Sequence, residues 1–490
     1  MSLTSHRAPR TVESLRIRHG TRFRWLVMLT AMIGTMASIM SSTIVNVAVP
    51  DLSHYFTLDQ AQAQWVSASF MIAMTLSMLL TPWLLARFGL YATYAGAIVL
   101  LMAGGITGGL AGSFWLVLAM RVVEGLAAGV LQPIPSIVIL RAFEPHEQGR
   151  ALGIFGFGVV LAPALGPTIG GFLVEHYGWR SIFFVVVPFC VAALVLARRY
   201  MPIQSQAPDR RALDWKGLVL VTIGIVCLLN GLAEVQGASR TSGLILLTVA
   251  VVAVALFIYT QLHNPAPLMQ MKLYKSRQFS MGALVSLIYG AGLFGSTYLL
   301  PVYMQMALPY GAGRAGLTLL PAGLVLAMVI PLGGKLADKY PAHILITGGL
   351  GVLAGSLALM ATVGPATPYL LLVLWVILGR VGIGFIFSAL SLATMRGMEP
   401  DLIAQASSTA NFVRQLGGAI GVSTTGILLE WRLATHPGGM TEHAIAFDET
   451  FLVLAGVCAA AMIAAWRMRP ASADKPKDQD KDTPSTAPTP

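Results

Sequence analysis

The sequence predicts an all-α protein that crosses a membrane many times, and three observations carry this prediction. Hydrophobic residues make up 56% of the 490 residues and charged residues only 11%, and the mean hydropathy is +0.73. The apolar residues form runs of about 20 residues or more, the length of helix that crosses a hydrocarbon core. Lys and Arg gather between these runs. A soluble domain of this length does not have this composition.

The apolar runs divide the chain into fourteen predicted spans. The first run begins at Trp25 and is longer than the apolar core of a cleavable signal peptide, so we expect it to be a span. The spans are predicted at residues 25–49, 64–85, 91–111, 114–140, 150–174, 181–200, 215–235, 242–262, 278–306, 314–335, 342–363, 367–395, 403–431 and 446–467.

The basic residues test this count, because Lys and Arg favour cytoplasmic segments. If the N-terminus is inside, every inner segment carries Lys or Arg, and residues 1–24 alone carry six Arg. We therefore expect a protein of the inner (plasma) membrane with both termini in the cytoplasm. Few basic residues fall elsewhere: Arg180, Arg240, Arg314 and Arg432 in outer segments, and Arg121, Arg380 and Arg414 inside spans.

An internal repeat predicts two halves. Arg121-Val-Val-Glu124-Gly125 in span four corresponds to Arg380-Val-Gly-Ile383-Gly384 in span twelve. Two parallel six-helix repeats with a site between them near the midplane are typical of secondary transporters. The expected organisation is a basic N-terminus (1–24), an N-terminal six-helix half (25–200), two inserted helices with linkers (201–277), a C-terminal six-helix half (278–467) and a disordered cytoplasmic tail (468–490).

Span four carries the most informative residues. Arg121, Glu124 and Gln132 fall on one face of the predicted helix together with small residues, and the rest of that helix is apolar. Glu124 follows Phe114 by ten residues, which places it roughly 15 Å into the span. It is the only acidic residue deep in any predicted span. An ionisable residue at that depth is costly, so its default interpretation is functional.

Glu124 is a candidate proton carrier. Burial favours the neutral form of a carboxyl and a neighbouring Arg favours the charged form, so the two effects can balance near the working pH. The hypothesis is that Glu124 loads and releases a coupling proton while Arg121 tunes it. The alternative is that Arg121 and Glu124, three residues apart, only neutralise each other as a structural pair.

Several polar residues at helical spacing are candidates for the lining of a substrate cavity. The structural alternative is that such side chains bond to their own helix or to backbone carbonyls. The candidates are Asn46, Gln132, Arg380, Phe387, Asn411 and Arg414. In span five, glycines and prolines allow close packing and bending, which suggests a hinge or seal at Pro163, Gly166, Pro167, Gly170 and Gly171.

Other classes of function are disfavoured. The basic residues have no interleaved aromatic residues, so a nucleic-acid partner is not expected, and the three cysteines lie far apart without a metal-binding spacing. There is no phosphate-binding Walker A motif. A pore would need a polar span in every repeat, and a hydrolase would need a Ser/His or paired-acid set. We therefore expect no enzyme activity, no cofactor and no metal.

The ordered motifs resemble those of the major facilitator superfamily, and within it the fourteen-helix drug:proton antiporters of the EmrB/QacA type. The resemblance covers nearly the whole chain. Its motifs are Ser42-Thr-Ile-Val-Asn46-Val-Ala-Val-Pro50, Arg121 to Gly125, Ala162-Pro-Ala-Leu-Gly166-Pro167-Thr-Ile-Gly170-Gly171, Gly178-Trp179-Arg180-Ser-Ile-Phe183, Leu300-Pro-Val-Tyr-Met-Gln305 and Asn411-Phe-Val-Arg414-Gln415-Leu-Gly417-Gly418.

The resemblance implies a major-facilitator fold and proton-coupled efflux of amphipathic or toxic small molecules by alternating access. It assigns Arg121 to a proton-relay motif, the Gly-Pro run of span five to the antiporter motif, and Arg87, Asp338 and Lys339 to gating loops. The implied partners are a small amphipathic substrate, protons and the lipid bilayer, and a periplasmic adaptor is left open.

Three departures from the family pattern qualify this interpretation. Ser41 stands where the family usually has an acid, Glu124 stands where it usually has Gln, and Ala86 replaces the Asp of the first gating loop. One hypothesis is that the coupling acid has moved from span one to span four. Two further functions stay open: export or facilitated transport of anionic amphiphiles such as fatty acids by Arg121, Arg380 and Arg414, and a substrate-gated membrane sensor.

Overall fold

The computed structural model describes residues 11–203, 211–236, 240–308, 310–364, 367–436 and 440–469, and all of the regular structure in these ranges is helical. The helices of the first half are α1 (Val12–His19), α2 (Arg22–Phe56), α3 (Gln60–Met78), α4 (Thr81–Gly109), α5 (Phe114–Leu131), α6 (Ile134–Ala142), α7 (Gln148–Tyr177), α8 (Ser181–Phe184) and α9 (Val186–Tyr200). The later elements are α10 (Trp215–Gln236), α11 (Arg240–His263), η1 (Met271–Lys275), α12 (Arg277–Met306), α13 (Ala312–Lys339), α14 (Ala342–Met360), α15 (Tyr369–Met395), α16 (Ile403–Thr435) and α17 (Met440–Trp466).

Within the described ranges, thirteen helical segments are long and apolar enough to cross a membrane. The predicted second span is the exception, because α3 carries Gln62, Gln64 and several Ser and Thr residues. It still packs lengthwise against α5 inside the bundle. Counted with α3, and with α5–α6 and α8–α9 as one span each, the helices give the predicted fourteen-span fold.

The boundary between the second and third spans lies where the sequence predicts it, between residues 85 and 91. α3 ends at Met78 and α4 begins at Thr81, but Leu79 and Leu80 between them keep right-handed helical dihedral angles. Pro82 lies in the first turn of α4, where a proline needs no backbone N–H bond and favours helix initiation. The predicted loop around Arg87 is a sharp break at Gly89, whose φ of 76° suits a residue without a side chain.

The predicted fourth span is one membrane-crossing segment, Phe114–Ala142, with a local interruption that divides it into two helices. α5 ends at Leu131 and α6 begins at Ile134, with Gln132 and Pro133 between them. Ser113 begins α5, because its hydroxyl accepts a hydrogen bond from the backbone N–H of Leu116. The break at Gln132 and Pro133 lies beyond the charged pair, so Arg121 and Glu124 are in the middle of the apolar helix α5.

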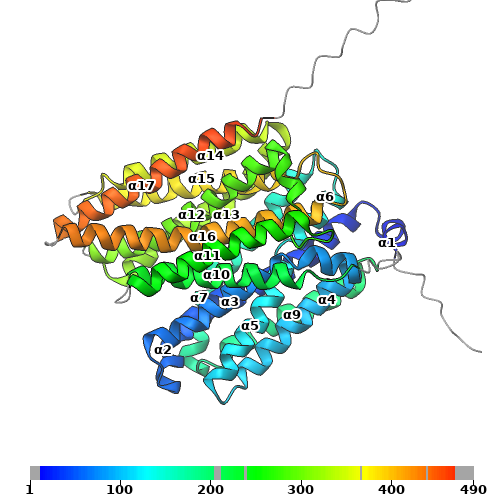
Figure 1. Ribbon diagram of the computed structural model, residues 1–490, viewed down its shortest axis with the longest axis horizontal. Coiled ribbons are helices and arrows are strands. Elements are labelled where there is room, and N and C mark those ends of the chain that lie inside the picture. The colour runs from blue at the N-terminus through cyan, green and yellow to red at the C-terminus, as the bar shows by residue number, and fades with distance from the viewer. Residues whose placement is uncertain are drawn as a thin grey trace, which may run out of the picture.

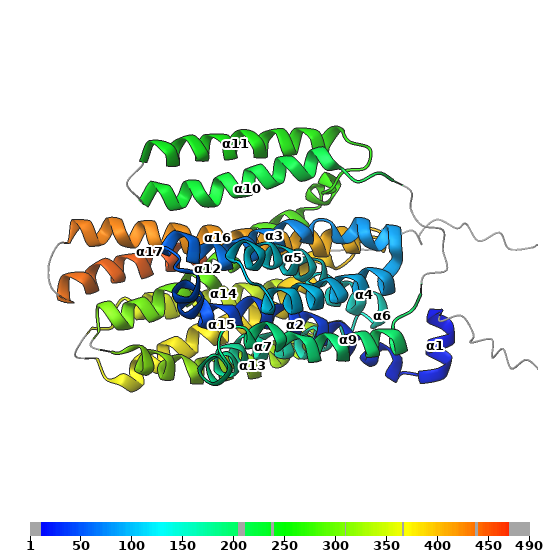
Figure 2. The same cartoon turned by 90° about the horizontal axis from the view of Figure 1, so that it is seen from below.

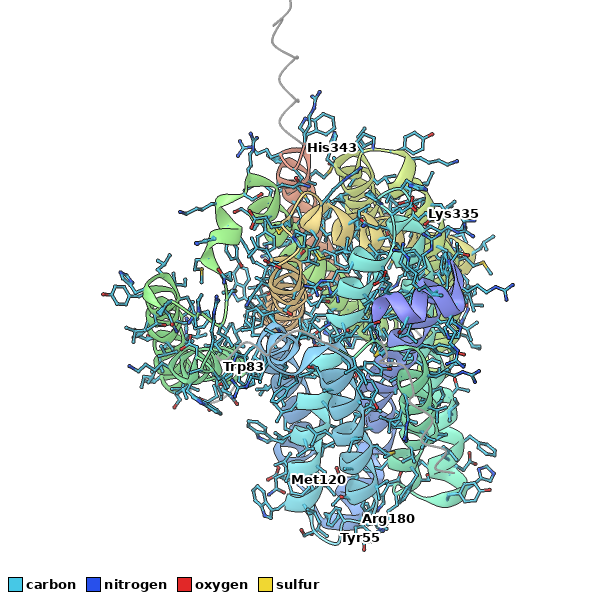
Figure 3. All side chains as sticks on the ribbon, turned by 90° about the vertical axis from the view of Figure 1, so that its right-hand side faces the viewer. Tyr55, Trp83, Met120, Arg180, Lys335 and His343 are labelled. Carbon is cyan, nitrogen blue, oxygen red and sulfur yellow. The ribbon has the colours of Figure 1, made fainter. Side chains whose placement is uncertain are left out.

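The helices form two groups that lie side by side (Figure 1). Helices α2 to α9 make the N-terminal half and α12 to α17 the C-terminal half, and Figure 3 places Met120 in the lower group and Lys335 and His343 in the upper one. The inserted pair α10 and α11 lies beside the bundle (Figure 2). α10 packs against α3 and α16 and so contacts both halves.

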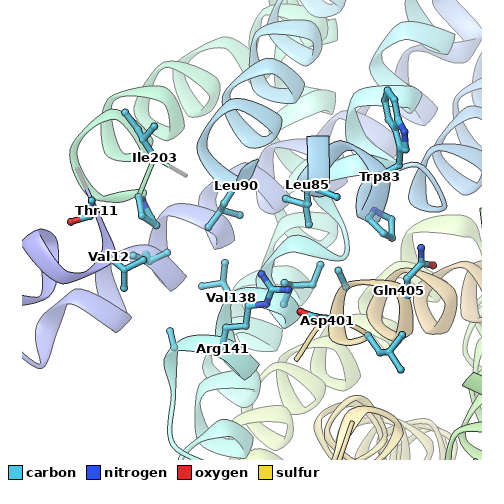
Figure 4. Close-up of a pocket in the computed structure, with 18 of the residues that line it drawn as sticks. Thr11, Val12, Trp83, Leu85, Leu90, Val138, Arg141, Ile203, Asp401 and Gln405 are labelled. Atoms are coloured by element: carbon cyan, nitrogen blue, oxygen red, sulfur yellow. The ribbon is translucent and has the colours of Figure 1, made fainter. Parts of the chain in front are cut away.

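The two halves are bonded to each other at the end of the bundle that holds α1 and α6 (Figure 1). The backbone N–H groups of Gly149 and Arg150 donate to the Asp338 carboxylate at 2.7 and 2.8 Å, and Ser407 Oγ donates to the Pro133 carbonyl at 3.2 Å. This is the end that the sequence predicts to face the cytoplasm. A cavity of about 1420 Å³ lies at the same end, lined by α1, α4, α6 and the start of α16 (Figure 4).

Candidate functional site

The charged pair of the N-terminal half is sealed inside the protein. Arg121 is completely buried and Glu124 is 1% exposed, and Arg121 Nη1 lies 2.7 Å from Glu124 Oε2. Arg121 also donates to the Val66 carbonyl at 3.1 Å and to Ser41 Oγ at 3.3 Å. Helices α2, α3 and α5 therefore hold one guanidinium together.

The surroundings of this pair are apolar and tight. The guanidinium carbon of Arg121 lies 4.2 Å from the centre of the Phe70 ring, a cation–π arrangement. Glycines of α4 leave room for the carboxyl, because a Cβ at Gly104 would come within 2.7 Å of Glu124 Cγ. Arg121 Nη2 and Glu124 Oε1 are shielded from solvent and have no hydrogen-bond partner among the described residues. The pair is neutral overall, but one donor and one acceptor in it are unsatisfied.

The C-terminal half holds four of the predicted cavity residues, and two of these four are arginines. Arg380 on α15 donates to Thr297 Oγ1 on α12 at 3.2 Å, and Arg414 on α16 donates to Asn411 Oδ1 at 2.6 Å. The Phe387 ring lies 5.7 Å from the Arg414 guanidinium carbon. Tyr289 is buried on α12, the helix that packs against both α15 and α16.

The remaining cavity candidates lie in the N-terminal half, apart from this cluster. Asn46 is exposed near the end of α2 away from the bonded seam, and its Oδ1 accepts a hydrogen bond from Ser67 Oγ at 2.7 Å. Gln132 is half-buried at the α5–α6 break. Thr297 was not among the sequence candidates, and no local pattern marks it, because its partner Arg380 is 83 residues away.

The Gly-Pro run lies on α7, which continues from Gln148 to Tyr177 without a break. A Cβ at Gly166 would come within 2.7 Å of Thr43 Oγ1, and one at Gly170 within 2.6 Å of Ile44 Cγ1. Gly171 has a looser contact, with Val47 at 4.0 Å. The motif thus allows close packing of α7 on α2. Pro163 is half-buried on the same helix, and the side chain of Pro167 lies outside the described residues.

The predicted gating residues behave differently in the two halves. Asp338 accepts two backbone hydrogen bonds at the beginning of α7, and so bonds the halves together. A carboxylate at a helix N-terminus also interacts favourably with the helix dipole. Lys339 is exposed at the end of α13, and Arg87 is half-buried on α4 two residues before the break at Gly89.

The fold and its central buried charges define a two-half helical membrane transporter, and the comparisons agree. The family model of the Major Facilitator Superfamily matches residues 31–422. The chain therefore belongs to this superfamily and, within it, to the EmrB type. It is a multi-pass membrane protein, and no group of His, Cys, Asp or Glu in its described part could hold a metal ion.

Among the relatives, the chain is 31% identical to the multidrug export protein EmrB of Escherichia coli K12, covering 85% of this chain and 82% of that protein. It is 28% identical to the lincomycin resistance protein LmrB of Bacillus subtilis, covering 81% and 84%. The human organic anion transporter MFSD10 has a similar fold, with a TM-score of 0.64, 13% identity and coverage of 90% and 99%.

Proposed function

We propose that the protein exports small amphipathic molecules across the inner membrane in exchange for protons, with Glu124 as the proton carrier. The export of drugs by EmrB, as its name states, supports the direction and the general substrate type. The observation that carries the proton assignment is the sealed Arg121–Glu124 pair, with an ion-pair distance of 2.7 Å.

The chemistry of the pair suggests how protonation is coupled to movement. A proton on Glu124 removes the counter-charge of Arg121, and an uncompensated buried charge costs several kcal/mol. The free energy of the arginine then falls if its side chain moves toward another polar group or toward water. Since Arg121 also bonds to α2 and α3, such a movement displaces three helices relative to one another. Release of the proton restores the pair and the original packing.

Transport by purified protein in liposomes tests this proposal. An imposed pH gradient should drive accumulation of a fluorescent amphiphile, with ethidium and anilinonaphthalenesulfonate as the cationic and anionic probes. Glu124→Gln should abolish gradient-driven accumulation, and Glu175→Gln at an exposed position of α7 should leave it unchanged. Full gradient-driven transport by Glu124→Gln would refute the proton role. Probe movement that ignores the gradient in the natural protein would indicate a facilitator, and binding without movement would indicate a sensor.

A second variant tests whether the position of the acid matters. Ser41 Oγ and Glu124 Oε2 contact the same nitrogen of Arg121, at 3.3 and 2.7 Å. A carboxylate at position 41 should therefore reach that guanidinium. Ser41→Asp added to Glu124→Gln should restore part of the gradient-driven accumulation, whereas Ser41→Asn added to it should restore none.

A further inference from the structure

We propose that Arg380 and Arg414 form a binding site for the negative charge of an amphipathic organic anion, and that such anions are a substrate class of this transporter. The inference rests on the proposed transport function and adds a substrate chemistry to it. It assigns different roles to the three arginines within spans: Arg121 is left out of the anion site, because it already has a carboxylate partner.

The first step of the argument is charge. Neither Arg380 nor Arg414 has an ion-pair partner in the part of the chain that the structure describes, whereas Arg24, Arg121 and Arg432 each have one. The repeat position that holds Glu124 in the first half holds Ile383, which is 2% exposed. The nearest side-chain partners of the two arginines are uncharged: the Thr297 hydroxyl and the Asn411 amide oxygen. The interior of the C-terminal half therefore holds two guanidinium groups without a carboxylate partner among the described residues.

The second step is access. Arg380 and Arg414 each donate one side-chain hydrogen bond to a described residue. Arg380 is 9% exposed and Arg414 is half-buried, so each residue keeps some accessible surface. Each arginine lies eleven residues into its helix, roughly 16 Å from the end. At that depth a guanidinium cannot face lipid cheaply, so its accessible surface has to face the interior of the protein.

The third step is location at the seam between the halves. Phe387 lies beside Arg414 and also against α7 of the other half, because a Cβ at Gly156 would come within 2.7 Å of Phe387 Cε1. The neighbouring Gln415 contacts Met71 Sδ of α3 at 3.9 Å. The arginines and an apolar ring therefore lie together at the seam between the two halves. When the charged group of an amphipathic anion bonds to the arginines, the apolar part of that anion can lie along this seam.

A binding measurement with matched probes tests the inference. Dansylaminoundecanoate provides a carboxylate on an apolar chain, its methyl ester is the uncharged match, and a dansyl alkyl-trimethylammonium is the cationic match. Fluorescence titration of the purified protein should show tighter binding of the carboxylate. Arg380→Gln and Arg414→Gln should each weaken carboxylate binding by about tenfold, the expected size of one charge-assisted bond. Ester binding should change by less than about twofold.

Controls separate this outcome from misfolding and from failure of proton coupling. Arg380→Lys and Arg414→Lys should retain most of the carboxylate binding, and Arg432→Gln, at a paired and partly exposed site, should bind as the natural protein does. Equal losses for acid and ester, or no preference of the natural protein for the acid, would overturn the inference. Because no gradient is applied, a negative result leaves the proton role of Glu124 intact, and a failure of Glu124→Gln to affect transport leaves this binding site intact.

Discussion

Arg121 and Arg380 occupy corresponding positions of the two halves, yet their surroundings differ. Arg121 is completely buried and is bonded to a carboxylate three residues further along its helix. Arg380 is 9% exposed, is bonded to a hydroxyl, and has Ile383 at the equivalent position. One residue per repeat therefore distinguishes an arginine that has a carboxylate partner on its own helix from one that has none there, and the proposals above rest on this difference.

The largest expected effect comes from breaking the closed pair. Arg121→Met leaves Glu124 buried without its counter-charge, which should cost about 3 to 5 kcal/mol of stability. Arg121→Met with Glu124→Met should recover most of this loss, because no charge remains buried. Thermal or denaturant unfolding in detergent measures both. The matched control is Arg432→Met, whose partner Glu449 is partly exposed and whose loss should cost about 1 kcal/mol or less. Similar costs for the two arginines would contradict the comparison.

A transplant of the acid should convert the open arginine into a closed one. Ile383→Glu places a carboxylate three residues after Arg380, as in the first half. Carboxylate-probe binding should fall by at least about tenfold, because the new Glu competes for the guanidinium, and binding of the cationic probe should improve. Ile383→Gln controls for the polar substitution itself and should change probe preference little. Unchanged preference with Ile383→Glu would show that Arg380 does not contact the substrate.

The seam between the halves should respond more mildly. Asp338→Asn weakens two hydrogen bonds to the beginning of α7. This should destabilise the joined conformation, in which the two halves are bonded at this end, by about 1 to 2 kcal/mol. Spin labels at the exposed Glu144 and Lys335 report the separation of the halves by pulsed electron resonance. The distance distribution should broaden toward longer values, and Glu175→Gln, at the exposed position of α7 used above, should leave it unchanged. An unaltered distribution in Asp338→Asn would mean that other contacts hold this end closed.

The smallest effect is expected from restoring the missing acid of the first half. Ala86 lines the cavity that also contains Ala404 and Gln405 of the first turn of α16. Ala86→Asp should favour the joined conformation by about 0.5 kcal/mol, because a carboxylate near a helix N-terminus is stabilising, and the nearby Asp401 reduces the gain. The same spin labels should show a shift toward short distances. A shift toward long distances would indicate that repulsion from Asp401 prevails.

Much of this molecule could be predicted from the chain because lipid constrains sequence strongly. Apolar runs of sufficient length and the alternation of basic segments predicted the fourteen-span fold, and the family resemblance is confirmed. The turn at Gly89 falls between the second and third predicted spans, and the predicted fourth span is one membrane-crossing segment, Phe114–Ala142. The sequence did not predict the local interruptions inside spans two and four, where Thr81-Pro82 begins α4 and Pro133 separates α5 from α6.

The site was predicted only in part, for a physical reason. Helical spacing placed Arg121 and Glu124 on one face, since both lie on the same helix. It could not supply the Val66 carbonyl, the Phe70 ring or the Thr297 hydroxyl, because contacts between helices depend on how the helices are rotated and packed. The predicted roles of the cavity, hinge and gating residues stay predictions that the experiments above address.

The sequence by itself determined the membrane class, the number of spans, the two repeats and the presence of three arginines and one acid within them. These follow from hydrophobicity, charge and periodicity, which are properties of the chain read in one dimension. Only the tertiary structure showed that Arg121 is completely buried against a carboxylate, whereas Arg380 and Arg414 bond to uncharged groups. That difference depends on accessible surface and on partners from other helices, and it separates a candidate proton site in one half from a candidate anion site in the other.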